Sequence, residues 1–142
     1  MRAYTTEEIL TLLGRHGVNP TVQRLEIARA LFSRCAHMSA EEIFVMVNAA
    51  GHQVSKATIY NTVGLFAEKG LVREVIVDPN KVFYDPNIAP HHHFYNVVTG
   101  ELMDIAASEM ELKALPQVPP GTCIEGVDVI VRLKPVSSPA SG

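Results

Sequence analysis

The first seventy residues of the chain alternate between helical stripes of apolar residues and short polar breaks. Thr5-Thr6-Glu7-Glu8 has the form of a capping box, and it predicts the start of a helix that ends at Gly17. Asn19-Pro20 predicts the cap and the first turn of a second helix, which ends near Cys35. The apolar stripes of these two helices comprise Ile9, Leu12 and Leu13 in the first and Leu25, Ala28, Leu31 and Phe32 in the second.

Two further helices follow at short intervals. Ser39-Ala40-Glu41-Glu42 repeats the capping box and predicts a third helix that runs to Gly51. Ser55 predicts the cap of a fourth helix that runs through Lys69. The residues expected to face inward from this fourth helix are Ile59, Val63 and Phe66. Four short helices in succession predict a compact bundle.

After Gly70 the pattern changes to that of strands. Residues 71–77 are rich in Val and Ile, Asp78-Pro79-Asn80 predicts a turn, and residues 81–84 predict a second strand. A hairpin after a helical bundle is the element order of a winged helix-turn-helix, in which the helix before the hairpin enters the major groove of DNA. The exposed first part of that helix carries the candidate DNA-binding residues Lys56, Thr58, Tyr60 and Asn61.

Prolines 86 and 90 predict a linker, and a second pattern of elements follows it. Residues 91–98 and 101–105 predict two strands joined by a Thr99-Gly100 turn, before a short helix around residues 108–115 and a final strand over residues 123–133. About 50 residues form only a small core, so pairing with a second copy is expected. The predicted fold class is therefore α+β, with an N-terminal winged helix-turn-helix DNA-binding domain over residues 1–86, a small α/β dimerisation domain over residues 87–134 and a disordered tail over residues 135–142.

Composition excludes several classes of protein. The 142 residues are 47% hydrophobic and 19% charged, which excludes a wholly disordered or collagen-like chain. No apolar run approaches the roughly 20 residues of a membrane span, and no signal-type stretch follows Met1, so a cytoplasmic protein without a membrane partner is expected. Cys35 and Cys123 form neither a Cys-x-x-Cys motif nor a disulfide framework.

The net charge of −3 is unevenly distributed along the chain. Residues 1–86 carry equal numbers of basic and acidic side chains, so the whole net charge lies in residues 87–142. Binding to DNA phosphates depends on local Lys and Arg side chains. Any such patch is therefore expected to be confined to the first half of the chain.

Three consecutive histidines at positions 91–93 are candidate metal ligands. Alternation along a strand places His91 and His93 on one face and His92 on the other. Asp85 lies just upstream, and Asp104 lies on the strand that the Thr99-Gly100 turn folds back beside the triplet. Two imidazoles and two carboxylates could therefore converge where the linker meets the second domain. A polar, solvated strand edge is the alternative interpretation of the triplet.

Several motifs occur in a fixed order along the chain. They are Gly17-Val18-Asn19-Pro20-Thr21-Val22-Gln23-Arg24, residues 35–43, Val54-Ser55-Lys56-Ala57-Thr58-Ile59-Tyr60-Asn61-Thr62-Val63, Gly70-Leu71-Val72, His91-His92-His93 and Gly100-Glu101-Leu102-Met103-Asp104-Ile105. In this order the chain resembles the ferric uptake regulator (Fur) family over roughly residues 8–133. The resemblance implies a dimeric winged-helix repressor, not an enzyme, that binds double-stranded operator DNA and whose metal occupancy sets its DNA-binding shape. The His triplet and residues 127–133 look most like the iron-response regulator (Irr) branch, whereas the ligand pattern also resembles the peroxide-sensing PerR branch.

The resemblance also implies a regulatory metal site. Its ligands, carried over position by position, fall on His37, Asp85, His91, His93 and Asp104. Three imidazoles and two carboxylates without a thiolate suit Fe²⁺, Mn²⁺ or Zn²⁺. One such ion would fix the angle between the DNA-binding half and the second half.

Departures from the family pattern modify what the resemblance implies. The candidates for a second metal site or for haem are His91, His92, His93 and Glu111, but the family's C-terminal histidine falls on Val127. Cys35 precedes Ala36 instead of the proline of a haem-regulatory dipeptide, and the structural zinc site built from cysteine pairs has no ligands in this chain. Asn19 stands where relatives place a basic residue, so phosphate contact is expected from Arg15 or His16. Arg24 of the same motif is a further DNA-binding candidate.

The resulting prediction is an iron-responsive or haem-responsive transcription regulator of iron homeostasis. The alternative within the family is a peroxide-sensing repressor of oxidative-stress genes, in which bound Fe²⁺ oxidises His37 or His91. A metal-dependent hydrolase built on the His/Asp cluster is disfavoured because the sequence has no His-Glu-x-x-His motif. A metal-storage or interaction module without DNA binding has the neutral first half as its only support.

Overall fold

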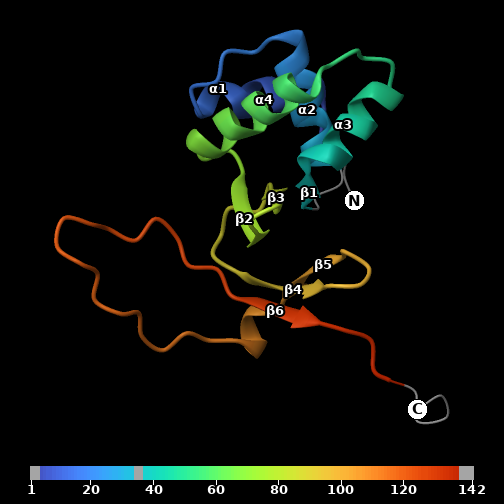
Figure 1. The fold of residues 1–142 in the computed structure, drawn as a ribbon. Coiled ribbons are helices and arrows are strands. Elements are labelled where there is room, and N and C mark those ends of the chain that lie inside the picture. The colour runs from blue at the N-terminus through green and yellow to red at the C-terminus, as the bar shows by residue number, and fades with distance from the viewer. Residues whose placement is uncertain (1–3, 34–36, 138–142) are drawn as a thin grey trace. The chain divides into compact units, whose positions relative to one another are not determined.

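The computed structural model describes residues 4–33 and 37–137, and the chain divides into two compact units at Ile88 and Ala89. Figure 1 shows the elements in chain order. The first unit contains α1 (Thr6–Arg15), α2 (Val22–Ser33), β1 (Met38–Ser39), α3 (Ala40–Ala49), α4 (Lys56–Glu68), β2 (Arg73–Asp78) and β3 (Lys81–Asp85). The second contains β4 (His92–Asn96), β5 (Leu102–Ile105), the 3₁₀ helix η1 (Ala107–Glu109) and β6 (Ile130–Leu133). The predicted α+β class is confirmed.

Three of the four predicted helix caps are formed as expected. In α1, Thr5 Oγ1 accepts from the Glu8 amide and Glu8 Oε1 accepts from the Thr5 amide, both at 3.1 Å. Ser39 and Glu42 form the same reciprocal pair at the start of α3. Ser55 Oγ accepts from the third amide of α4. Each cap stabilises its helix by about 1 kcal/mol relative to alanine.

The predicted cap of α2 at Asn19 is wrong. The helix begins at Val22, and the hydroxyl of Thr21 accepts from the Arg24 amide at 3.1 Å. A capping side chain reaches the amide two or three residues ahead, and from Asn19 those amides precede or only begin the helix. Thr21 therefore occupies the capping position. Cys35, where the helix was expected to end, lies outside the described residues.

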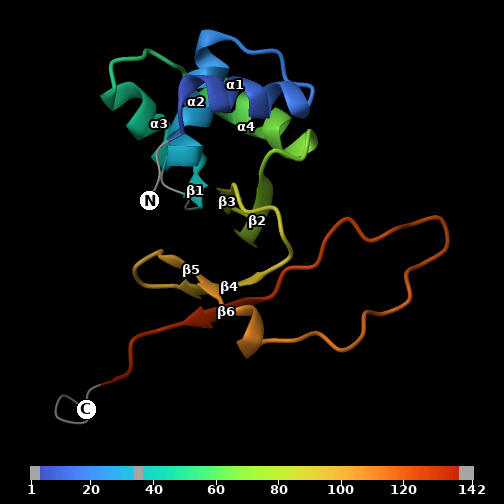
Figure 2. The ribbon, with the colours of Figure 1, turned by 180° about the vertical axis from the view of Figure 1, so that it is seen from behind.

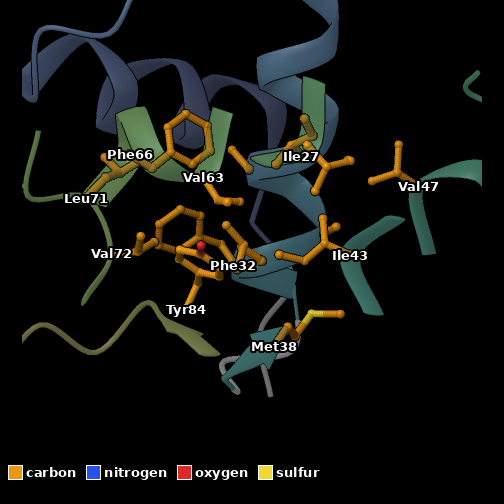
Figure 3. Packing of buried hydrophobic residues seen from close by; sticks show 14 of the residues in the cluster. Ile27, Phe32, Met38, Ile43, Val47, Val63, Phe66, Leu71, Val72 and Tyr84 are labelled. Atoms are coloured by element: carbon orange, nitrogen blue, oxygen red, sulfur yellow. The ribbon is translucent and has the colours of Figure 1, made fainter. Parts of the chain in front are cut away.

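The core of the first unit unites the four helices with the hairpin. Ile59, Val63 and Phe66 are fully buried, which confirms the predicted inward face of α4. Figure 3 shows Val63 and Phe66 near Phe32 of α2 and Tyr84 of β3. Burying an aliphatic or aromatic side chain of this size contributes about 1.5–3 kcal/mol. This packing holds α4 and the hairpin in a defined relation to the rest of the unit.

A small antiparallel sheet of order β1-β3-β2 completes the first unit, and Figures 1 and 2 both show it at one end of the helices. The predicted hairpin is confirmed, with Asp78 Oδ1 accepting from the Asn80 amide in its turn. The two residues of β1 are too few to show a strand pattern, so periodicity does not predict this strand. Met38 pairs with Tyr84 and Ser39 with Phe83.

The second unit is built on a three-stranded sheet of order β5-β4-β6. The antiparallel pair β4 and β5 is joined at the predicted turn, where Gly100 has a φ of 76°. Asp104 lies on the strand that was predicted to fold back beside the His triplet, and the register places it opposite His93. Strand β6 pairs with β4 in parallel, with Ile130 beside His93.

One predicted element of the second unit is wrong, and the predicted final strand is too long. In place of a helix around residues 108–115 there is the three-residue η1, and the final strand covers Ile130–Leu133 and not residues 123–133. Figures 1 and 2 show the chain between η1 and β6 as a long loop without regular secondary structure. A helix as short as the one predicted over residues 108–115 is stable only when its apolar face packs against other residues. Leu112 and Leu115, which would form that face, are exposed in this segment.

Among the described residues, no helix has the length and apolarity required to cross a membrane. Residues 138–142, which form the end of the predicted tail, lie outside the described residues.

Candidate DNA interface and metal-ligand clusters

The start of α4 carries two exposed candidate DNA-binding residues on one face. Lys56 and Tyr60 are four residues apart, which places them one above the other on a helix surface. Tyr60 is 49% exposed although it is a large aromatic residue, so it is not part of the core. Asn61 is also exposed. These three side chains therefore lie at the surface of the first unit.

The fourth candidate on α4, Thr58, is part of the helix cap. Its amide donates to Ser55 Oγ at 3.1 Å, and its hydroxyl accepts from the Ser55 hydroxyl at 3.0 Å. Both contacts are local, and the residue is half-buried. Thr58 therefore fixes the start of α4.

A carboxylate that the sequence analysis treated only as part of a helix cap lies beside these residues. The Tyr60 hydroxyl donates to Glu41 Oε1 at 3.0 Å, and Lys56 Nζ lies 3.3 Å from Glu41 Oε2. The hydrogen bond from Tyr60, followed by the interactions with Lys56, lowers the pKa of Glu41, and the same hydrogen bond raises the pKa of Tyr60. Glu41 is therefore ionised and the Tyr60 phenol protonated near neutral pH.

The two predicted arginines occupy different environments in the first unit. Arg15 is the last residue of α1 and is exposed. Arg24 Nη1 donates to the Asn19 carbonyl at 2.9 Å and so links α2 to the segment that precedes it. Arg15 is available for a phosphate, whereas part of the Arg24 guanidinium already has a structural role.

Two of the predicted metal ligands come together within the first unit. His37 precedes β1 and Asp85 ends β3, so the antiparallel pairing of Met38 with Tyr84 places them across from each other. A ligand atom of His37 and one of Asp85 lie within 4.8 Å. Asp85 is buried, and the His37 ring packs edge-on against Phe83 with ring centroids 6.2 Å apart. The short strand β1, which periodicity could not predict, creates this pair.

The other three predicted ligands come together within the second unit. Nε2 of His91 and Nε2 of His93 lie 3.4 Å and 3.2 Å from the same atom, Asp104 Oδ1. The two rings stand with their centroids 4.4 Å apart. The side chain of His93 is fully buried, whereas that of Asp104 is 56% exposed. We call His91, His93 and Asp104 the second-unit cluster.

Backbone contacts fix the direction of the His91 ring. Its Nδ1 lies 2.7 Å from the Ala89 carbonyl, which only accepts, so Nδ1 carries the proton. In a neutral ring Nε2 then presents its lone pair to the Asp104 carboxylate. Two acceptors facing each other require a proton or a cation between them. A metal-ligating histidine commonly donates its other N–H to a carbonyl in this way, so the second-unit cluster fits a divalent cation.

The residues predicted for a second site or haem are arranged differently. His92 points away from the second-unit cluster, and its Nδ1 accepts from the Val129 amide at 3.0 Å. In the neutral ring Nε2 then carries the proton and has no lone pair for a ligand. Glu111 lies in the irregular segment after η1 and is exposed. Through this hydrogen bond His92 holds the segment before β6 beside β4.

A helical bundle whose last helix presents an exposed face and precedes a β-hairpin is the arrangement of winged-helix DNA-binding proteins, and the histidine and carboxylate clusters are candidate metal ligands. The sequence model of the ferric uptake regulator family matches residues 15–118. The chain belongs to this family.

Individual relatives agree with this assignment. The chain is 31% identical to the peroxide-responsive repressor PerR of Staphylococcus aureus over 112 residues, which cover 78% of this chain and 76% of that protein. The fold of this chain is similar to that of the ferric uptake regulator of Pseudomonas aeruginosa with manganese, with a TM-score of 0.68 and a sequence identity of 24%. The similarity covers 89% of this chain and 97% of the other. The ferric uptake regulator of Vibrio cholerae gives the same TM-score at 20% identity, over 88% and 98% of the two chains.

Membership of the family determines the class of function. Regulators of this family bind operator DNA as dimers and respond to divalent metals, so the protein is a metal-responsive transcription regulator and not an enzyme. The predicted family and fold are confirmed, whereas the Irr branch stays a prediction.

Replacing Tyr60 with alanine should weaken specific binding by about 1–3 kcal/mol per half-site. The physical reason is that an exposed ring on this helix can pack on thymine methyls, which distinguish base pairs in the major groove. The fold should remain intact because the side chain lies outside the core. Titration of an operator duplex measures the change, and unchanged affinity would remove Tyr60 from the interface.

Proposed function

We propose that the protein is an iron-responsive, dimeric transcription regulator of iron homeostasis in which one ferrous ion joins the two units. The proposed ligands are His37, Asp85, His91, His93 and Asp104. The observation that carries the proposal is the second-unit cluster, in which two imidazole nitrogens face one carboxylate oxygen. The protein would act in the cytoplasm, where the operators are.

The donor atoms of the second-unit cluster suit a metal ion. The two imidazole rings stand with their centroids 4.4 Å apart, and Nε2 of each faces the same carboxylate oxygen. A single divalent cation between these atoms would meet both rings and the carboxylate at once. The mixture of imidazole and carboxylate without thiolate suits Fe²⁺, Mn²⁺ or Zn²⁺, and the proposed role in iron homeostasis selects Fe²⁺ among them.

The ligands of the first unit would couple the ion to DNA binding. His37 and Asp85 are held by the pairing of β1 with β3, and β3 belongs to the hairpin that packs on α4. When bound, the ion would supply positive charge shared by ligands of both units. Its binding energy would then favour only those arrangements of the units in which all ligands meet. In this way metal occupancy would bias the placement of α4 on an operator.

A peroxide sensor is the second candidate, and a specific observation favours it. Staphylococcal relatives at 30% and 31% identity are named peroxide-responsive repressors. The same ligands would serve both functions, and they differ in what peroxide does to the protein. In the sensor, peroxide and Fe²⁺ together would add an oxygen atom to His37 or His91.

Operator binding under anaerobic conditions separates these two functions. We expect Fe²⁺ and Mn²⁺ each to raise operator affinity, and peroxide to leave the masses of peptides containing His37 and His91 unchanged. A peroxide sensor would lose binding in the Fe²⁺ form only and gain the mass of one oxygen atom on one of these peptides. An operator affinity that is the same with and without every divalent metal would contradict both functions.

Haem is the remaining ligand that the sequence resemblance adds, and the geometry supports it less. Of the triplet, His91 and His93 face Asp104, whereas His92 accepts a hydrogen bond from the Val129 amide. We therefore expect His93→Ala to lower Fe²⁺ affinity strongly and His92→Ala to leave it within a few-fold of the unchanged protein. Isothermal titration with Mn²⁺ or Fe²⁺ measures both variants. Equal losses in the two would show that the face of the strand does not matter, contrary to the proposal.

A further inference from the structure

Glu41 places a negative charge on the surface that the proposed function presents to DNA. Its carboxylate is 55% exposed and contacts the exposed ends of Lys56 and Tyr60. A carboxylate on such a surface repels phosphates, and it also competes with them for the lysine. Its position therefore requires a benefit that outweighs the loss of phosphate affinity.

We propose that Glu41 is a positioning residue for sequence-specific DNA binding, which orients the Tyr60 ring and neutralises Lys56 so that α4 discriminates bases at the expense of nonspecific affinity. This inference rests on the proposed binding of DNA by α4. It adds a residue of α3 to the determinants of specificity, although that residue lies outside the recognition helix.

The geometry allows one carboxylate to act on both residues. Lys56 and Tyr60 lie one turn apart on α4, and each contacts a different oxygen of Glu41. The hydrogen bond to Oε1 restricts the rotation of an otherwise exposed phenol ring. A ring with one orientation loses less conformational entropy when it packs on a base than a freely rotating ring does.

Lys56 is held toward α3 by two contacts. Its Nζ lies 3.3 Å from Glu41 Oε2 and 5.5 Å from the centroid of the Phe44 ring. In this arrangement the ammonium partly neutralises Glu41 and interacts less strongly with a phosphate. Electrostatic contacts to phosphates are independent of sequence and supply most nonspecific binding. Restraining this lysine therefore lowers nonspecific affinity more than specific affinity.

The ionisation of the network supports the same arrangement. Hydrogen bonding from Tyr60 and Lys56 keeps the pKa of Glu41 below its ordinary value, and the pKa of Tyr60 is raised. The carboxylate acceptor and the phenol donor are therefore both present at neutral pH. Lys81 of the hairpin adds a further favourable charge for the Glu41 carboxylate.

The test compares Glu41→Gln with a matched control, Glu7→Gln. Both glutamates are exposed, and each is the second residue of a helix that begins with a capping box. The two variants therefore lose the same charge from equivalent helix positions. Binding to an operator duplex and to a scrambled duplex is measured over a range of salt concentrations in the metal-loaded full-length protein.

Glu41→Gln should bind scrambled DNA more tightly and discriminate it less well from the operator. The slope of log affinity against log salt concentration should steepen by about 0.9 per half-site, since the freed Lys56 gains one phosphate contact. The ratio of operator to scrambled affinity should fall about tenfold. Glu7→Gln should change neither the slope nor the ratio.

Tyr60→Phe separates orientation of the ring from neutralisation of the lysine. This variant keeps the ring and the charges but removes the hydroxyl that Glu41 binds. It should lower the affinity ratio without a change in the salt slope, and its effect on the ratio should not add to that of Glu41→Gln. Additive effects on the ratio, or a Glu41→Gln protein that matches the Glu7→Gln control, would overturn the inference. Failure of the unchanged protein to prefer its operator in any metal state would instead overturn the proposed function, and this inference with it.

Discussion

Replacing His37 with alanine should uncouple operator binding from metal while leaving dimerisation intact. His37 is the predicted ligand that comes from the helical part of the first unit, next to β1. Loss of this ligand should lower metal affinity by more than the roughly 10- to 100-fold that removal of a ligand's outer partner costs. The remaining ligands of the second unit would still bind metal weakly, without linking it to the DNA-binding unit.

Three measurements on the His37→Ala protein test this expectation. Metal titration should show the weakened site, operator titration should show the same affinity with and without metal, and sedimentation should show an unchanged dimer. His52→Ala is a suitable control because His52 belongs to the same unit but pairs with Glu26 at 3.1 Å. A haem sensor would give the opposite ranking, with the haem absorption band lost on substitution of residues 91–93 and unaffected by His37→Ala. A variant that is unchanged in all three measurements would contradict a metal switch that includes His37.

A fragment ending at Ile88 should remain folded but lose nearly all operator binding at physiological salt. The first unit has its own core, which extends from Ile9 to Tyr84, so it does not depend on the second unit for burial. Residues 1–86 have no net positive charge, and a single winged helix makes few phosphate contacts. A dimer binds the operator more tightly because binding of the second half-site is intramolecular. This raises the overall affinity by about 10²-fold or more.

Sedimentation and operator titration of the fragment test this prediction. A monomer with a cooperative unfolding transition and little affinity for the operator is expected. Joining two such fragments through an unrelated dimerisation segment should recover part of the affinity. A monomeric fragment with the full affinity of the intact protein would contradict the requirement for a dimer.

The first unit was predicted well because its signals are local. The capping boxes at Thr5 and Ser39 each lie within four residues of sequence, and both form as expected. The hairpin turn at residues 78–80 is equally local. The second unit was predicted less well, because a helix near Leu112 depends on what covers its apolar face, and no sequence pattern determines that.

The ligand clusters show where sequence patterns stop being informative. Alternation along the strand predicted over residues 91–98 placed His91 and His93 on one face, because strand geometry has a fixed period. Both rings face Asp104, although β4 itself begins at His92. The pairing of His37 with Asp85 depends on β1, which joins residues almost fifty positions apart. Glu41 was missed because its contacts with α4 are tertiary, whereas its sequence context indicated only a helix cap.

The most direct test of a metal switch is reciprocal coupling between metal and operator. Mn²⁺ affinity of the full-length protein is measured by titration in the absence and in the presence of a saturating operator duplex. If metal raises operator affinity by a given factor, the operator must raise metal affinity by the same factor. We expect tighter Mn²⁺ binding on the operator, and loss of this increase in His37→Ala. Equal Mn²⁺ affinities with and without the operator would show that the ion bound by these ligands does not control DNA binding.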